Sequence, residues 1–128
     1  MKKNEPANRA GGRPAFRVVR PHRSEYPDPL RSPEGTGLRF ERRSSPWPGW
    51  IWCEDETGRA GWTPESWVEI RGDRCVLRRD YDAAELDVDP GDRLAGVEEE
   101  SGWLLAITPD GRRGWVPLDR LEPDHSAR

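Results

Sequence analysis

The sequence predicts an all-β protein built from two small units in tandem, and three observations support this fold class. Gly and Pro occur 13 times each in 128 residues, and both interrupt helices. Apolar residues make up 33% of the chain and charged residues 35%, so there is too little apolar material for one large core. Seven Trp can support two small cores, because each buried Trp removes about 150–250 Å² from water.

The tandem organisation is indicated by an internal repeat. Residues 49–69 align with residues 102–122 at a shift of 53 without a gap, and eight of the 21 positions are identical. Both copies begin with Gly-Trp, continue with Gly-Arg-x-Gly-Trp-x-Pro and end with Glu. A repeat of this kind indicates two copies of one structural unit. The first halves match more loosely, because the first copy has a longer loop over residues 41–48.

Each copy is expected to form short strands joined by turns. In the second copy a bulky apolar strand over 102–108, a turn over 109–112 and a returning strand from 114 predict a hairpin. The first copy predicts the same hairpin, with its turn at 56–59. Residues 74–88 have near-helical apolar spacing, but the matching part of the first copy contains four prolines. A strand followed by an irregular loop is therefore expected there.

The predicted domain boundaries follow from the repeat. The chain is expected to consist of a disordered basic arm (1–15), a first domain (16–70), a linker (71–73), a second domain (74–123) and a disordered tail (124–128). On this prediction each copy folds as a domain of its own.

The second copy resembles an SH3 domain along its whole length. Residues 80–83 resemble the family's opening tyrosine motif, residues 85–86 its acidic-apolar pair, and residues 90–94 its Gly-Asp turn. Gly102-Trp103 carries the family's binding-face Trp, and residues 114–117 resemble its Gly-apolar-apolar-Pro signature, which a 3₁₀ turn usually follows. The whole chain resembles the tandem variant SH3 proteins of bacteria. This resemblance implies two small five-stranded SH3-like barrels in tandem.

SH3 domains bind extended, proline-rich peptides on an aromatic face, so the resemblance implies a non-catalytic protein-interaction module or adaptor. The partner is then a protein or peptide, which can be proline-rich. Carried over by position, the second copy offers as ligand-binding residues Tyr81, Trp103 and Pro117, with the acidic partners Asp82 and Glu85. The first copy offers the residues Tyr26, Trp47, Trp50, Pro64 and Trp67.

The first copy is expected to be the better binding site, because Trp67 stands where the second copy has Arg120. Two alternatives stay open for Trp50 and Trp103: they are exposed binding rings, or they are buried against the neighbouring barrel. Trp62 and its repeat partner Trp115 are interpreted as structural residues.

Catalysis, cofactors and metals have little support in the sequence. Neither His22 nor His125 lies in a nucleophile motif, and no phosphate-binding Gly-rich loop precedes a helix. Cys53, Cys75 and the two His lack the spacing of a zinc site. We therefore expect no enzyme activity, no cofactor and no metal. Cys53 is expected to be a packed small residue, and Cys75 has no evident partner.

A cytoplasmic protein without membrane contact is expected, because no apolar run approaches about 20 residues and no signal sequence follows the opening Met-Lys-Lys. The alternative function is a nucleic-acid-associated small barrel protein that uses the basic N-terminal arm. The acidic balance of residues 74–123 argues against it. The oligomeric state is left open.

Overall fold

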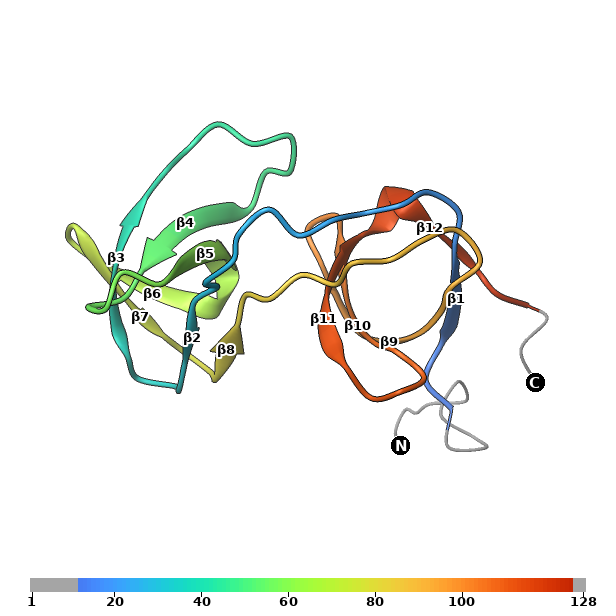
Figure 1. Ribbon diagram of the computed structural model, residues 1–128. Helices are drawn as coiled ribbons and strands as arrows, with labels where there is room; N and C mark the ends of the chain where they lie inside the picture. Colours follow the sequence, from blue (N-terminus) through green and yellow to red (C-terminus); the bar gives the residue numbers. More distant parts are fainter. Residues whose placement is uncertain (1–11, 126–128) are drawn as a thin grey trace, which may run out of the picture. The chain divides into compact units, whose positions relative to one another are not determined.

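The computed structural model describes residues 12–125, and this part of the chain is all-β (Figure 1). It contains strands and two short 3₁₀ turns, η2 (Glu65–Trp67) and η3 (Leu118–Arg120), and no α-helix between residues 12 and 125. The predicted all-β class is thus confirmed. In the same range no helix has the length and apolar character needed to cross a bilayer.

The chain divides into two compact units. The described residues of unit 1 are 12–23 and 85–125, and unit 2 consists of residues 24–84. Unit 1 is therefore built from both ends of the chain, which passes between the units twice. This division differs from the predicted domains 16–70 and 74–123. The predicted linker, residues 71–73, lies within unit 2 at the turn between two adjacent strands.

Unit 1 contains an antiparallel five-stranded sheet with the strand order β11-β10-β9-β1-β12. Its strands are β1 (Ala15–Val18), β9 (Arg93–Glu100), β10 (Trp103–Ile107), β11 (Arg113–Pro117) and β12 (Leu121–Pro123). β1 lies inside the sheet, with Phe16 opposite both Leu94 of β9 and Pro123 of β12. The N-terminal strand thus completes the sheet of the second copy.

Unit 2 contains an antiparallel five-stranded sheet with the strand order β5-β4-β3-β7-β6. Its strands are β3 (Gly37–Glu41), β4 (Trp50–Glu54), β5 (Ala60–Pro64), β6 (Val68–Arg71) and β7 (Arg74–Leu77). β7 lies inside this sheet, with Cys75 opposite both Leu38 of β3 and Ile70 of β6. A separate two-stranded sheet pairs β2 (Arg31–Ser32) with β8 (Tyr81–Asp82). The predicted strand and irregular loop over 74–88 are both present.

Relative to the predicted domains, β1 and β7 each pair with the sheet formed by the other repeat copy. In Figure 1 the blue β1 lies among the orange and red strands of unit 1, and the yellow-green β7 lies next to the cyan β3 of unit 2. The cause is local. Arg71 pairs with Arg74, so β6 and β7 form a hairpin with a two-residue turn, in which Gly72 has φ 65°. This hairpin commits β7 to unit 2, and β1 takes the equivalent position in unit 1.

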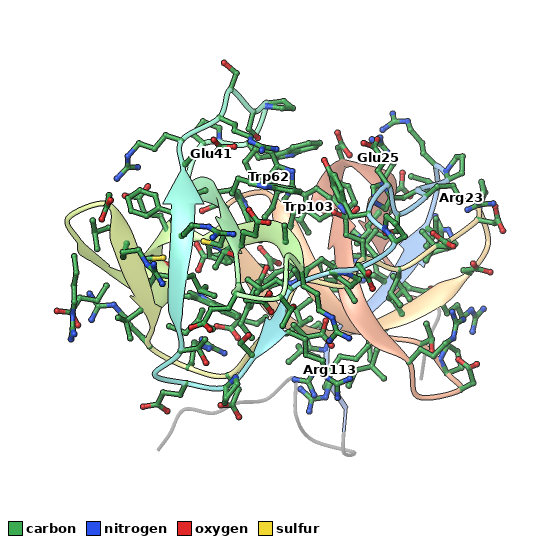
Figure 2. The ribbon with its side chains drawn as sticks, turned by 60° about the vertical axis from the view of Figure 1, so that its left-hand side comes forward. Arg23, Glu25, Glu41, Trp62, Trp103 and Arg113 are labelled. Atoms are coloured by element: carbon green, nitrogen blue, oxygen red, sulfur yellow. The ribbon has the colours of Figure 1, made fainter. Side chains whose placement is uncertain are left out.

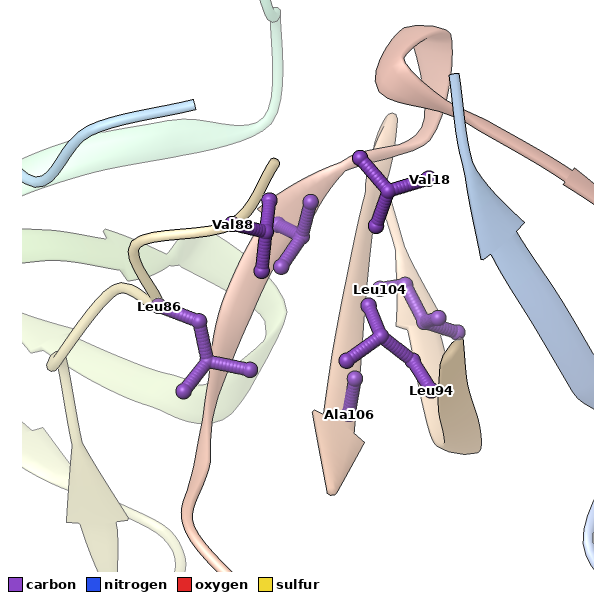
Figure 3. Close-up of a cluster of buried hydrophobic side chains, with 7 residues drawn as sticks. Val18, Leu86, Val88, Leu94, Leu104 and Ala106 are labelled. Carbon is purple, nitrogen blue, oxygen red and sulfur yellow. The ribbon is translucent and has the colours of Figure 1, made fainter. Parts of the chain in front are cut away.

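The core of unit 1 also draws on both ends of the chain (Figure 3). β1 contributes Val18, and the remaining members come from residues 86–116. The full cluster is Val18, Leu86, Val88, Leu94, Leu104, Ala106 and Val116. Side chains from separate segments are buried together here, so β1 is an integral part of the unit. In unit 2, Cys53 is completely buried, which confirms its expected place as a packed small residue.

The predicted arm and tail fall mostly outside residues 12–125, and their described ends belong to the fold. Ala15 is the first residue of β1, and its carbonyl accepts a hydrogen bond from the Asp124 N–H at 2.9 Å. The Asp124 side chain is buried, with a carboxylate oxygen 3.5 Å from the Arg93 Nε. Ordered structure therefore begins before residue 16 and continues beyond residue 123, because β1 and the end of β12 support each other.

Candidate ligand-binding surface

One face of the β3-β4-β5 sheet in unit 2 presents a row of large side chains. Along β4, Ile51 and Cys53 are buried, so Trp50 and Trp52 lie together on the opposite face. Trp52 is directly opposite Glu41 of β3 on one side and Trp62 of β5 on the other. Figure 2 labels the two ends of this row, Glu41 and Trp62. The register therefore places two Trp side by side across neighbouring strands.

Tyr26 joins this pair from the segment that precedes β2. Its ring centroid is 5.0 Å from that of Trp52, and the Trp52 and Trp62 centroids are 5.4 Å apart in an edge-on arrangement. The Trp62 Nε1–H donates to the Tyr26 hydroxyl at 3.4 Å. All three side chains are half-buried. We call Tyr26, Trp52 and Trp62 the aromatic row; it combines apolar area with polar groups at a surface, as binding sites often do.

A cation already lies on the aromatic row. The Arg43 guanidinium is 4.4 Å from the Trp52 ring centroid, and it also donates a hydrogen bond to the Glu41 carboxylate. Glu41 is thus placed by the sheet next to Trp52, and it orients the arginine over the ring. One face of the Trp52 ring is therefore in contact with a cation of the chain itself.

Four of the predicted ligand-binding residues, Trp50, Pro64, Trp67 and Tyr81, are buried in unit 2. Trp50 is 8% exposed, Trp67 5% and Tyr81 4%. The Tyr81 and Trp67 rings meet edge-on at 5.5 Å, and the Tyr81 hydroxyl donates to the Trp62 carbonyl at 2.5 Å. Pro64 is also buried, opposite Trp50. Trp50 is therefore a buried residue and not an exposed binding ring.

Tyr81 was assigned to the second copy, and the structure places it in unit 2 beside Trp67 of the first copy. The Arg79 guanidinium lies 3.6 Å from the Trp67 ring centroid and covers part of that ring. The face of Trp67 that was expected to meet a ligand is therefore in contact with the chain itself. Trp47 is half-buried in the loop before β4, where its N–H bonds the Ser45 hydroxyl at 3.0 Å.

The rest of the predicted second-copy site lies in unit 1. Trp103 is 8% exposed and Pro117 is buried opposite it. The His22 ring packs edge-on against Trp103 at 5.5 Å. His22 follows β1 as Tyr81 follows β7, so the strand exchange replaces the expected tyrosine by histidine in this unit. Tyr81 and Trp103, which the resemblance placed in one site, thus belong to different units.

The two acids expected to bind a ligand have partners within their own units. The Glu85 carboxylate and the His22 Nε2 are joined by a hydrogen bond of 2.8 Å, and both side chains are nearly buried. Asp82 is exposed, accepts from the Ala84 N–H at 2.9 Å and lies 3.9 Å from the Arg31 Nε. Glu85 is therefore less available to a ligand than Asp82, because Asp82 is exposed to solvent.

Sequence reasoning missed Trp52 and treated Trp62 as structural. A signal was present for Trp52 alone, because its spacing from Trp50 places the two rings on one face of a strand. A turn at 56–59 would pair Trp52 with Thr63, whereas the observed register pairs Trp52 with Trp62. The repeat alignment gave no sign of this pair. Trp62 aligns with an identical Trp115, but Trp52 aligns with Leu105.

An ion pair close to this sheet gives a pH-dependent prediction. The Arg42 guanidinium donates to the Glu65 carboxylate at 2.8 Å and holds the pKa of Glu65 below its usual value, against a smaller opposing effect of burial. The folded state is thus stabilised above the unfolded pKa of about 4.3, and this contribution is lost as the pH falls further. Glu65→Gln is expected to lower the urea midpoint slightly at pH 7 and not at pH 3.

The effect is small because both side chains are largely exposed to water. Glu56→Gln, in the exposed turn after β4, is the control for loss of a carboxylate. An equal effect of Glu65→Gln at both pH values would contradict the assigned role of the Arg42 pair.

The fold and this surface define a class: an all-β protein of two five-stranded units, one of which carries a half-buried aromatic row. Between residues 12 and 125 no group of three or more His, Cys, Asp or Glu side chains is placed to hold a metal ion. Comparisons with protein families, curated proteins and solved structures found no match for the chain. The function is therefore inferred from the residues themselves.

Proposed function

We propose that this chain is a non-catalytic binding protein made of two SH3-like barrels with exchanged first strands. We further propose that unit 2 binds an extended peptide segment of a partner protein on the aromatic row. The single observation that carries the binding proposal is the contact of three half-buried rings, Tyr26, Trp52 and Trp62, on one sheet face.

The connectivity supports the SH3-like part of the proposal. In unit 1, β1 lies between β9 and β12, and β10 and β11 follow β9 in order. In unit 2, β7 takes the position of β1, between β3 and β6, and β4 and β5 follow β3 in order. A 3₁₀ turn occurs at the same place in both units: η3 connects β11 to β12 in unit 1, and η2 connects β5 to β6 in unit 2. These features agree with the sequence resemblance to SH3 domains, although the first strand of each unit comes from the other copy.

The properties of the aromatic row support binding of an extended peptide. Trp and Tyr are the residues that most often dominate binding energy at interfaces, because they remove much apolar area from water with little loss of rotamer freedom. Flat rings lying next to one another offer surfaces for proline rings, and a polyproline II segment loses little entropy when it binds. A peptide guanidinium that stacks on Trp52 would take the place of Arg43, which the exposed loop before β4 allows to move away.

The test begins with selection of peptides against the full chain from a displayed library that contains random and proline-rich sequences. The affinity of an enriched peptide is then measured by calorimetry for the wild type, Trp52→Ala and Trp62→Ala. Each substitution is expected to weaken binding at least about tenfold, as loss of an interface Trp commonly does. Circular dichroism verifies that the variants are folded.

Ile70→Ala is the matched control, since Ile70 is a large apolar side chain on β6 that is 38% exposed and lies outside the aromatic row. Its affinity is expected to equal that of the wild type. If folded Trp52→Ala and Trp62→Ala bind as tightly as Ile70→Ala, or if no peptide is enriched, the proposed function is wrong.

A further inference from the structure

Two cysteines that are distant in the sequence meet inside unit 2. Cys53 lies on β4 and Cys75 on β7, and both are completely buried. Their Sγ atoms are 3.9 Å apart, which is direct contact. β3 separates the two strands in the sheet, with Phe40 opposite Cys53 and Leu38 opposite Cys75, so the thiols approach each other on the core side of a curved sheet.

The contact makes the two thiols chemically different. The hydrogen bond with Cys75 and burial both raise the pKa of Cys53. The hydrogen bond from Cys53 lowers the pKa of Cys75, and the neighbouring Arg74 acts in the same direction. Cys75 is therefore the thiol that ionises first, and the thiolate is the form that attacks a disulfide.

We propose that Cys53 and Cys75 form a redox-modification site, which closes to an intramolecular disulfide by exchange with a small-molecule disulfide such as glutathione disulfide. The Cys75 thiolate attacks one sulfur of the oxidant, forms a mixed disulfide and releases one small thiol. Cys53 then loses its proton and attacks the Cys75 sulfur, and the second small thiol leaves. The two protein thiols lose two electrons, and the oxidant is reduced to two thiols that take up both protons.

The position of the pair indicates what this bond would do. β4 belongs to the first copy and β7 is the strand that the second copy contributes to unit 2. A bond between Cys53 and Cys75 would thus join the exchanged strand covalently to its host sheet. It would also close a loop through β5, η2 and β6, which restricts the unfolded chain. Neither thiol belongs to the aromatic row, so this inference does not depend on the proposed function.

Burial sets the conditions of the reaction. Both sulfurs are shielded from water, so the oxidant reaches them only when unit 2 opens locally around β7. The exchange is therefore expected to be slow in native buffer and faster near the start of the thermal transition. The reduced sulfurs are already in contact, but β3 lies between β4 and β7, so closure of the second step requires these two strands to move toward each other.

The experiment uses the full chain in native buffer with glutathione disulfide, followed by unfolding, alkylation and intact-mass measurement. The expected result is a monomer that loses both alkylatable thiols together and carries no glutathione. Its thermal midpoint is expected to rise on the order of 10 °C, and the rise should disappear with dithiothreitol. Cys53→Ser and Cys75→Ser, if folded by circular dichroism, should retain one thiol or one glutathione adduct and show no such rise.

The same measurements on the wild type keep the proposal falsifiable if either variant fails to fold. Two outcomes would overturn it. One is a native chain that keeps both thiols, or collects glutathione adducts, under conditions in which the urea-unfolded chain forms the disulfide. The other is a disulfide form whose thermal midpoint lies at or below that of the reduced form, because the bond would then distort the sheet it is proposed to hold.

Discussion

Division of the chain between Gly72 and Asp73 is expected to leave neither half able to fold alone. Fragments 1–72 and 73–128 should each lack a cooperative thermal transition by circular dichroism. Mixed in equal amounts, they are expected to associate and recover the transition of the intact protein. Size-exclusion chromatography of the mixture should show one species with the mass of the full chain.

The physical reason is that each fragment lacks an inner strand of its main sheet. Fragment 1–72 contains β1 of unit 1, and fragment 73–128 contains β7 of unit 2. Fragment 1–72 lacks β7, which brings Cys75 and Leu77 into the core of unit 2 with 0% and 1% exposure. Truncation of one such buried side chain commonly costs about 2–5 kcal/mol, while a whole domain is stable by only about 5–15 kcal/mol. Loss of an inner strand also removes the backbone hydrogen bonds to β3 and β6. Fragment 73–128 lacks β1 in the same way.

Tandem domains without exchange predict the opposite result. If residues 16–70 form an independent domain, fragment 1–72 should fold cooperatively by itself, and addition of the second fragment should not change its transition. That outcome would contradict the exchanged arrangement. A protease site placed at the exposed Gly72 turn offers a second measurement, since cleavage of the folded chain should leave the two halves bound to each other.

Gly61→Ala is expected to destabilise the protein by about 1–3 kcal/mol, measured from the urea midpoint. A Cβ at residue 61 would lie 2.6 Å from the Cβ of Ala83, which is closer than two carbon atoms can approach. Gly61 is on β5 of the first copy, and Ala83 follows β8 in the second copy. The clash therefore arises only when the segment after β7 packs in unit 2.

A double-mutant cycle with Ala83→Gly isolates this contact. Removal of the Ala83 methyl group makes room for the new one, so the double variant should be more stable than the sum of the single effects by about 0.5–3 kcal/mol. Gly37→Ala is the control, because a Cβ there would meet nothing within 4 Å. Additive effects in the cycle, or an equal loss from Gly37→Ala and Gly61→Ala, would contradict the placement of Ala83 beside β5.

Much of the local structure could be predicted because it depends on near neighbours in the sequence. The turn at 109–112 forms as expected between β10 and β11, where the Gly111 N–H bonds the Thr108 carbonyl at 2.9 Å. The burial of Cys53 follows from its alternation with Trp52 along β4. These features require only side-chain alternation and the backbone freedom of glycine at a turn.

The candidate surface was less predictable, because the burial of an aromatic ring depends on what packs over it. Trp50 and Trp52 are two residues apart and lie on the same face of β4, yet Trp50 is buried and Trp52 is half-buried. Trp67 is in contact with Arg79 and Tyr81, which come from a part of the chain that was assigned to the other domain. The sequence pattern shows which face a residue shares, and distant segments decide how much of that face remains exposed.

From the sequence alone one could predict the all-β fold class, the internal repeat and the positions of the two repeated hairpins. The sequence also contained a sign of the exchange, because residues 72 and 73 leave room only for a tight turn between β6 and β7. Only the three-dimensional strand pairing shows which sheet contains β1 and which contains β7. The reason is that equivalent strands fit equivalent sheets, so the repeat identifies the partners of β1 and β7 but not the copy in which each partner lies.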